Sequence, residues 1–221
     1  MKNIGYIFIC VCFIQQAVGQ HYIEKSVETS SKNIEIYLND IDNLLLESTP
    51  DNIVSVKLKE AQVAQLSSIN FSHEKNGFVI RALEKFTSQD QFNKFCVEQP
   101  ALLLYVITVP NHSNVSLKIG KGNLFINNFE GNLNAEVDTG EVLLNNIIGD
   151  VSLFIIDGVV RSKIQKAALN IKTNLGEVIS TLPLKTKLQN PKMIRGVYKS
   201  KSQMLTIKAI KANIYLDAVK D

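Results

Sequence analysis

Hydrophobic and polar residues alternate along several stretches between residues 33 and 109, as expected for strands with one buried face. The alternating runs are IEIYL, IVSVKL, FVIRAL and ALLLYVITV, and turn-forming stretches such as STPDN and HEKNG separate them. Residues 60–69 and 86–100 break the alternation and are expected to form loops or short helical turns. The zone 33–109 therefore predicts an irregular set of N-terminal strands.

A small residue recurs every nine positions within the zone 113–184. The positions are Gly122, Gly131, Gly140, Gly149, Gly158, Ala167 and Gly176. Only 11 of the 221 residues are glycine, so an internal repeat explains the spacing better than chance does. Because glycine accepts a positive φ without the steric cost of a Cβ atom, the six glycines are predicted to be structural turn residues.

The nine-residue units are of two kinds, so the period of the repeat is 18 residues. One kind alternates strictly, as in GNLNAEVDT, and the other carries paired asparagines, as in GNLFINNFE. We predict an all-β, single-stranded β-solenoid (a β-helix or β-roll) with about 18 residues and two strands per coil, in which residue i lies beside residue i+18. Apolar columns such as Val115, Leu133, Val151 and Leu169 would fill its interior.

The two ends of such a stack would leave unpaired strand edges, which must be capped. The irregular N-terminal strands in 33–109 and the C-terminal strands in 204–217 are the segments outside the regular repeats. We therefore expect these segments to cap the solenoid.

The first twenty residues differ from the rest of the chain. A short, positively charged start precedes an apolar run from Ile4 to Ile14, and Ala17-Val18-Gly19 supplies small residues before a cleavage at Gln20. This layout predicts a secretory signal peptide at 1–19 and a single domain at 20–221. A transmembrane anchor and a lipidated cysteine are the alternatives, although the apolar run is shorter than the roughly 20 residues that a membrane span needs.

Charge and cysteine content limit the kinds of partner and the cellular compartments to be expected. The formal net charge is +3 and there is no run of lysine and arginine, so no nucleic-acid partner is expected. Signal-peptide removal would leave Cys96 as the one cysteine, so packing and backbone pairing must stabilise the domain without disulfides. We expect export across the inner membrane to the periplasm, the outer-membrane surface or the exterior, with no transmembrane helix in the mature chain.

Motifs that carry chemistry are few. The three histidines stand at unrelated spacings, and the sequence has no phosphate-binding glycine loop, zinc motif or nucleophile elbow. Eighteen positions after Glu130 and Asp138 stand isoleucines, so no acidic ladder for calcium is expected. The acidic residues beside the repeat glycines are Glu130, Asp138, Asp150 and Asp157. No catalytic residue, metal ligand or cofactor is predicted.

One pair of carboxylates keeps an enzymatic alternative open. Glu141 and Glu177 share a column of the predicted coils, two coils apart, with Val159 between them. Glycoside hydrolysis needs two carboxylates on one face, and a separation of about 9–10 Å is near the upper limit for inverting enzymes. A polysaccharide-active enzyme on a β-helix scaffold is therefore the alternative to a non-enzymatic protein.

The paired asparagines define a candidate interaction face. Its members are Asn127, Asn128, Asn145 and Asn146. In an 18-residue coil their amides would stack into a structural hydrogen-bonded ladder. The same amides could instead hydrogen-bond a carbohydrate or another β-edge, so both roles stay open.

The order of the strand-like segments resembles a known bacterial family. IEIYLNDIDNLLLES is followed by DNIVSVKL, NGFVIRAL, YVITVPNHSNVSLKIGKGNLFI, short Gly-x-hydrophobic units and a last pair, MLTIKAIKANIYL. The series covers about residues 22–217 and is similar to the head-GIN-like putative adhesins of unknown function, which are common in Bacteroidetes. The resemblance implies a β-solenoid, an extracytoplasmic location and no known enzymatic activity.

The function predicted from these features is that of an exported, non-enzymatic, adhesin-like protein with a binding or structural role at the bacterial cell envelope. Its partner would be an unknown protein or glycan at the cell surface. The alternatives are the polysaccharide-active enzyme and a self-assembling structural protein of the envelope. The sequence predicts neither the ligand nor the oligomeric state.

Overall fold

The computed structural model describes residues 22–59, 69–82 and 104–219. All elements of this part of the chain are strands, which confirms the all-β prediction. They are β1 (Tyr22–Glu28), β2 (Asn33–Thr49), β3 (Ile53–Lys59), β4 (Ile69–Glu74), β5 (Gly77–Ala82), β6 (Leu104–Pro110), β7 (Ser113–Ile148), β8 (Val151–Ile164), β9 (Ala167–Thr173), β10 (Val178–Ser180), β11 (Lys185–Asn190), β12 (Met193–Tyr198) and β13 (Met204–Ala218).

Some sequence-based predictions fall on residues that are not described. They concern the signal peptide, the single remaining cysteine Cys96, the stretch 86–100 and nearly all of 60–69. These predictions are not tested. Within the described ranges, the search for a helix long and apolar enough to cross a membrane finds none.

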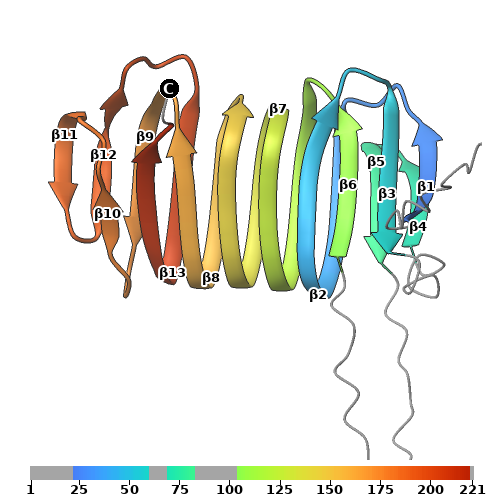
Figure 1. The fold of residues 1–221 in the computed structure, drawn as a ribbon, viewed down its shortest axis with the longest axis horizontal. Helices are drawn as coiled ribbons and strands as arrows, with labels where there is room; N and C mark the ends of the chain where they lie inside the picture. The colour runs from blue at the N-terminus through green and yellow to red at the C-terminus, as the bar shows by residue number, and fades with distance from the viewer. Residues whose placement is uncertain (1–21, 60–68, 83–103, 220–221) are drawn as a thin grey trace, which may run out of the picture.

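The strands form one open, mixed sheet of thirteen strands. Its central part is parallel and runs β2, β7, β8, β13, β9, while antiparallel pairs lie at both ends (Figure 1). The long strand β7 pairs with β8 in a register that joins Leu133 to Val151 and Val142 to Val160, residues 18 positions apart. Side-chain amides within β7 join at the same separation, since Asn132 donates to Asn114.

The position of β13 differs from the prediction. Its residue Leu205 pairs with Val151 of β8 on one side and with Leu169 of β9 on the other. The C-terminal strands therefore lie inside the stack rather than capping it, and β9 does not pair with β8 (Figure 1). The alternation of β13 matches that of its neighbours, and pairing depends on this match rather than on nearness along the chain.

The core consists of the inward side chains of all the parallel strands. Ile36, Leu117, Leu153 and Ile207 are each 0–1% exposed and belong to one continuous apolar cluster. Arg161, Ser162 and Lys163 interrupt the apolar pattern of the repeat in the sequence, but they leave this core intact. Only Ser162 of that stretch is buried, while Arg161 points outward, 4.7 Å from the ring centroid of Tyr215, and bonds Glu141 Oε1 at 3.0 Å.

The repeat glycines stack on one another at the bends between strand runs. Positive φ angles occur at Gly122, Gly131, Gly140, Gly149 and Gly158. Gly176 has no positive φ, but a Cβ atom there would lie 1.8 Å from the carbonyl oxygen of Ala212. The bends therefore need glycine for two reasons, backbone conformation and the close approach of the neighbouring backbone.

Candidate functional site

The carboxylates of the enzymatic alternative lie farther apart than the sequence predicts. Glu141 is level with Val159, Val159 is level with Asn213, and the backbone N–H of Glu177 donates to Asn213 Oδ1 at 3.1 Å. Insertion of β13 thus places three strand spacings between them, about 14 Å, which exceeds the separations used by glycosidases. Glu141 is also ion-paired with Arg161. The structure does not bring these two residues into one site.

Three of the four acidic residues beside the repeat glycines have separate partners. Glu130 lies 3.5 Å from His112 Nδ1, and Asp157 lies 3.3 Å from Lys211 Nζ. Asp150 accepts the backbone N–H of Met204 at 2.7 Å. In the described ranges no group of three or more histidine, cysteine, aspartate or glutamate side chains is arranged to hold a metal ion.

The paired asparagines form a ladder of amide hydrogen bonds, as their structural role requires. Asn145 Nδ2 donates to Asn127 Oδ1 at 2.9 Å, and Asn146 Nδ2 donates to Asn128 Oδ1 at 2.6 Å. Asn128 and Asn146 have φ angles of 49° and 50°, a left-handed conformation that asparagine tolerates better than most residues. Their amides therefore stabilise a bend, whatever else this face binds.

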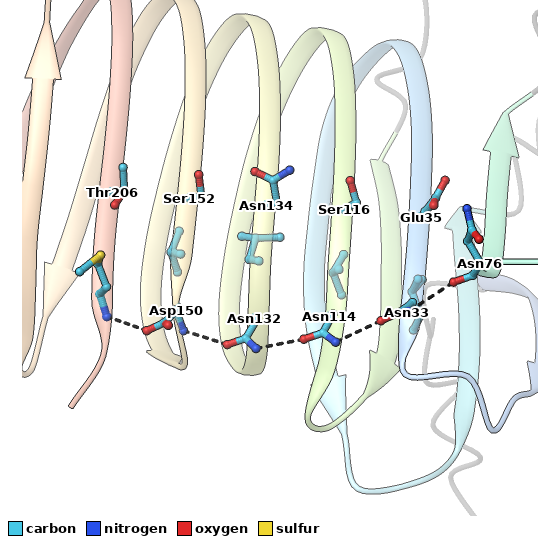
Figure 2. A pocket seen from close by; sticks show the side chains of 15 residues that line it. Asn33, Glu35, Asn76, Asn114, Ser116, Asn132, Asn134, Asp150, Ser152 and Thr206 are labelled. Atoms are coloured by element: carbon cyan, nitrogen blue, oxygen red, sulfur yellow. Dashed lines mark hydrogen bonds between the residues drawn. The ribbon is translucent and has the colours of Figure 1, made fainter.

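A larger polar surface lies on the strand runs that alternate strictly, away from the runs that carry the paired asparagines. It is an open groove of about 470 Å³ that crosses β2, β7, β8 and β13 and is closed at one end by Asn76, in the turn between β4 and β5. We call it the amide groove. Its polar lining residues are Asn33, Glu35, Asn76, Asn114, Ser116, Asn132, Asn134, Asp150, Ser152 and Thr206 (Figure 2).

One edge of the amide groove is a continuous row of hydrogen bonds. Asn33 donates to the Asn76 carbonyl at 3.3 Å, Asn114 donates to Asn33 at 3.1 Å, and Asn132 donates to Asn114 at 3.0 Å. The row continues with the backbone N–H of Asp150, which donates to Asn132 Oδ1 at 3.2 Å (Figure 2). Each amide is therefore held in one orientation by its neighbours, which makes this edge rigid.

A second row of side chains in the groove points away from the core. Ser116 and Asn134 lie on β7, Ser152 lies on β8, and Thr206 lies on β13 (Figure 2). The side chains of Ser116, Asn134 and Ser152 are exposed and have no hydrogen-bond partner among the described residues. Adjacent members are one strand spacing apart, about 4.8 Å. This row presents regularly spaced donors and acceptors that a ligand can use.

The N-terminal end of the amide groove carries a carboxylate. Glu35 accepts a hydrogen bond from the Tyr37 hydroxyl at 2.7 Å. This hydrogen bond, together with partial burial, raises the pKa of Tyr37, because the bonded phenol is the protonated form. The Arg81 guanidinium lies 5.1 Å from the Tyr37 ring centroid. This end of the groove is therefore acidic and is held in place by neighbouring side chains.

Sequence reasoning missed the amide groove although part of it was visible. Asn114, Asn132 and Asp150 recur at intervals of 18 residues, and so do Ser116, Asn134 and Ser152. The strictly alternating nine-residue units therefore contain both rows. The contributions of Asn33, Asn76 and Thr206 were not visible, because they depend on pairing between segments far apart in the chain.

One known structure shares the fold of this chain. A putative cell adhesion protein from Clostridium sporogenes aligns over 90% of this chain and 99% of its own, with 11% identity and a TM-score of 0.58. A putative adhesin from Bacteroides fragilis covers 90% of this chain and 98% of its own, with 14% identity and a TM-score of 0.39. The first likeness shows a common fold and nothing more. No family model and no curated protein matches the sequence.

Proposed function

We propose that this protein is an exported, non-enzymatic, adhesin-like β-solenoid that binds a glycan at the bacterial cell envelope. The amide groove is the binding site in this proposal. The observation that carries it is the outward row of hydroxyl and amide groups, which have no partner among the described residues and lie beside a rigid amide ladder. Sugar hydroxyls are donors and acceptors of the same kind, so the two surfaces are chemically complementary.

The numbers of residues that separate paired positions in the sequence support a solenoid with coils of about 18 residues. Leu133 pairs with Val151 at an offset of 18. Leu205 pairs with Val151 at an offset of 54 and with Leu169 at an offset of 36, which are three and two times 18. A constant coil length lets a distant segment enter the stack in register.

The rigidity of the strands favours ligand binding over catalysis as the function of the amide groove. The backbone of each coil is bonded to the coils on both sides, so the outward side chains sit on a fixed lattice and little backbone entropy is lost when a ligand binds. The separation of Glu141 and Glu177 removes the one carboxylate pair that the sequence offered for hydrolysis. An adhesin-like role also agrees with the name of the cell adhesion protein from Clostridium sporogenes, whose fold this chain shares.

A glycan array probed with the purified protein tests the proposed function. We expect binding to at least one glycan, and no release of sugar during prolonged incubation. The double variant Asn134→Ala/Ser152→Ala should weaken that binding about tenfold, because it removes two unpaired groups worth about 1.4 kcal/mol together. Its free energy of unfolding should stay within about 0.5 kcal/mol of the original protein, since both side chains are exposed.

Two further variants separate the alternatives. Glu141→Gln/Glu177→Gln should bind and unfold like the original protein, and loss of a measured sugar release in this variant would establish the enzymatic alternative instead. Asn127→Ala/Asn145→Ala removes one step of the other amide ladder. Binding that is lost in this variant and kept in Asn134→Ala/Ser152→Ala would place the site on the paired-asparagine face and contradict the proposal.

A further inference from the structure

The amide groove continues toward the C-terminal end of the stack, where its character changes. Met204 lines both the amide groove and a second cavity of about 280 Å³. Asn170 and Arg195 line that cavity and a third one, of about 320 Å³. The three hollows therefore follow one face across β2, β7, β8, β13, β9 and β12. We call the third hollow, lined by Phe154, Lys172, Met193, Arg195, Lys208 and Ile210, the cationic groove.

Two lysines lie directly beside each other in the cationic groove. Lys208 of β13 is level with Lys172 of β9, and both side chains are exposed. Neither has an ion-pair partner among the described residues. Like charges that face each other across neighbouring strands repel and destabilise the pair. An anion bound between the two ammonium groups would relieve this repulsion.

The charges around the two lysines favour an anion as well. Arg195 adds a third cation to the groove, and its Nε donates to Asn170 at 3.4 Å. The nearest acidic side chain level with Lys208 is that of Glu136, which lies beyond Phe154 on the next strand run. Its carboxylate is 3.6 Å from Lys118 Nζ. That carboxylate is therefore engaged by another lysine.

Apolar side chains surround the cations. Phe154 and Ile210 are each 38% exposed, although both are large and hydrophobic. Phe154 is level with Lys208, so an exposed aromatic ring and an ammonium group stand side by side on the same face. An aromatic ring next to fixed charges suits a ligand whose units combine an apolar C–H face with ionised groups. A sugar ring that bears a carboxylate or a sulfate ester has this combination.

We infer that the protein binds an acidic polysaccharide, with carboxylate- or sulfate-bearing sugars in the cationic groove and uncharged sugars of the same chain in the amide groove. This inference rests on the proposed function and names the class of glycan. The two grooves lie on one face and are joined by the second cavity, which shares Met204 with the amide groove and Asn170 and Arg195 with the cationic groove. One extended polymer can therefore occupy both. The small net charge of +3 and the grouping of the cations in a hollow favour this ligand over nucleic acid or an anionic membrane.

Pairs of glycans that differ only in charge test the inference. The full chain is probed with a panel that contains uronate oligosaccharides and their methyl esters, and sulfated glycans and their desulfated forms. We expect at least one acidic member to bind about tenfold or more tightly than its neutral counterpart, with an affinity that falls as sodium chloride is raised. If no pair shows a preference while neutral glycans bind, the inference is overturned and the proposed function stands. If no glycan of either kind binds, both fail.

Matched variants locate the effect. Lys172→Gln/Lys208→Gln should abolish the preference for the acidic member and leave binding of the neutral member unchanged. Its thermal midpoint should not fall, because the change removes a repulsion. The control Lys121→Gln/Lys163→Gln removes the same charge from exposed lysines outside the groove and should keep the preference. Equal loss in both variants, or tighter binding of an oligodeoxynucleotide or of phosphatidylglycerol vesicles than of every acidic glycan, would contradict the inference.

Discussion

Replacing Ile207 with alanine is expected to lower the free energy of unfolding by about 2–5 kcal/mol. Ile207 is 0% exposed and lies on β13, where it is level with Leu153 of β8 and Ile171 of β9. The substitution would leave a cavity beside β8 and β9. These two strands do not pair with each other, and β13 lies between them in the sheet. Denaturant unfolding followed by circular dichroism measures the change.

Ile210→Ala on the same strand is the matched control. Ile210 is 38% exposed, so the same deletion of methyl and methylene groups should cost less than about 1 kcal/mol. If β13 were a cap at the end of the stack, as the sequence predicts, truncating Ile207 would disturb packing against one neighbouring strand only. A cost for Ile207→Ala no larger than that for Ile210→Ala would contradict the central position of β13.

Gly140→Ala is expected to cost about 3 kcal/mol or more, because two effects add. Gly140 has a φ of +155°, which an L-residue adopts only with strain of about 1–3 kcal/mol. A Cβ atom there would also lie 1.9 Å from the carbonyl oxygen of Gly122, which belongs to the backbone and cannot rotate away. The neighbouring strand runs would have to separate. The same denaturant titration measures the loss.

Gly120→Ala separates these effects from the general cost of removing a glycine. Gly120 has no positive φ, and its Cβ would lie 3.2 Å from the carbonyl oxygen of Asn39, a tight contact that small shifts relieve. We expect a change within about 1 kcal/mol. Equal costs at the two positions would show that the bends do not require glycine.

Periodicity made the strands and their buried faces predictable where the chain keeps its 18-residue interval. The alternation of residues 113–164 identified the inward columns, and the glycine spacing identified the bends. Both signals arise from local physics, namely the two-residue period of a strand and the steric demand of a Cβ atom. The pairing of β7 with β8 agrees with them.

The place of β13 was not predictable from the same signals. Alternation specifies which face of a strand is buried, but any strand with a matching pattern can occupy a given slot. Leu169 has a side chain as suitable as that of Leu205 for the place beside Val151, and only the long-range pairing decides between them. Predictions that depended on the slot, such as the distance between Glu141 and Glu177, failed for this reason.

The same limit applies to the candidate site. The repeated asparagines and serines were present in the sequence, but the paired asparagines drew attention because they stand next to each other. A ladder that takes one residue from each strand run can be recognised only when the pairing register is known. The cationic groove joins Lys172, Arg195 and Lys208 from three strands. Lys172 and Lys208 are 36 residues apart, twice 18, but they become neighbours only because β13 pairs with β9, and Arg195 stands at no multiple of 18 from either.

Both grooves require β13 to lie between β8 and β9, and engineered disulfides test this order directly. In a background with Cys10, Cys12 and Cys96 changed to serine, Ser152→Cys/Thr206→Cys should oxidise readily. These residues are level on adjacent strands, and the strand spacing of about 4.8 Å falls within the range of Cα separations that disulfides bridge. Ser152→Cys/Asn170→Cys should stay reduced, because Thr206 separates the two positions and about 10 Å is too far. A disulfide in the second variant and none in the first would contradict the order of the stack.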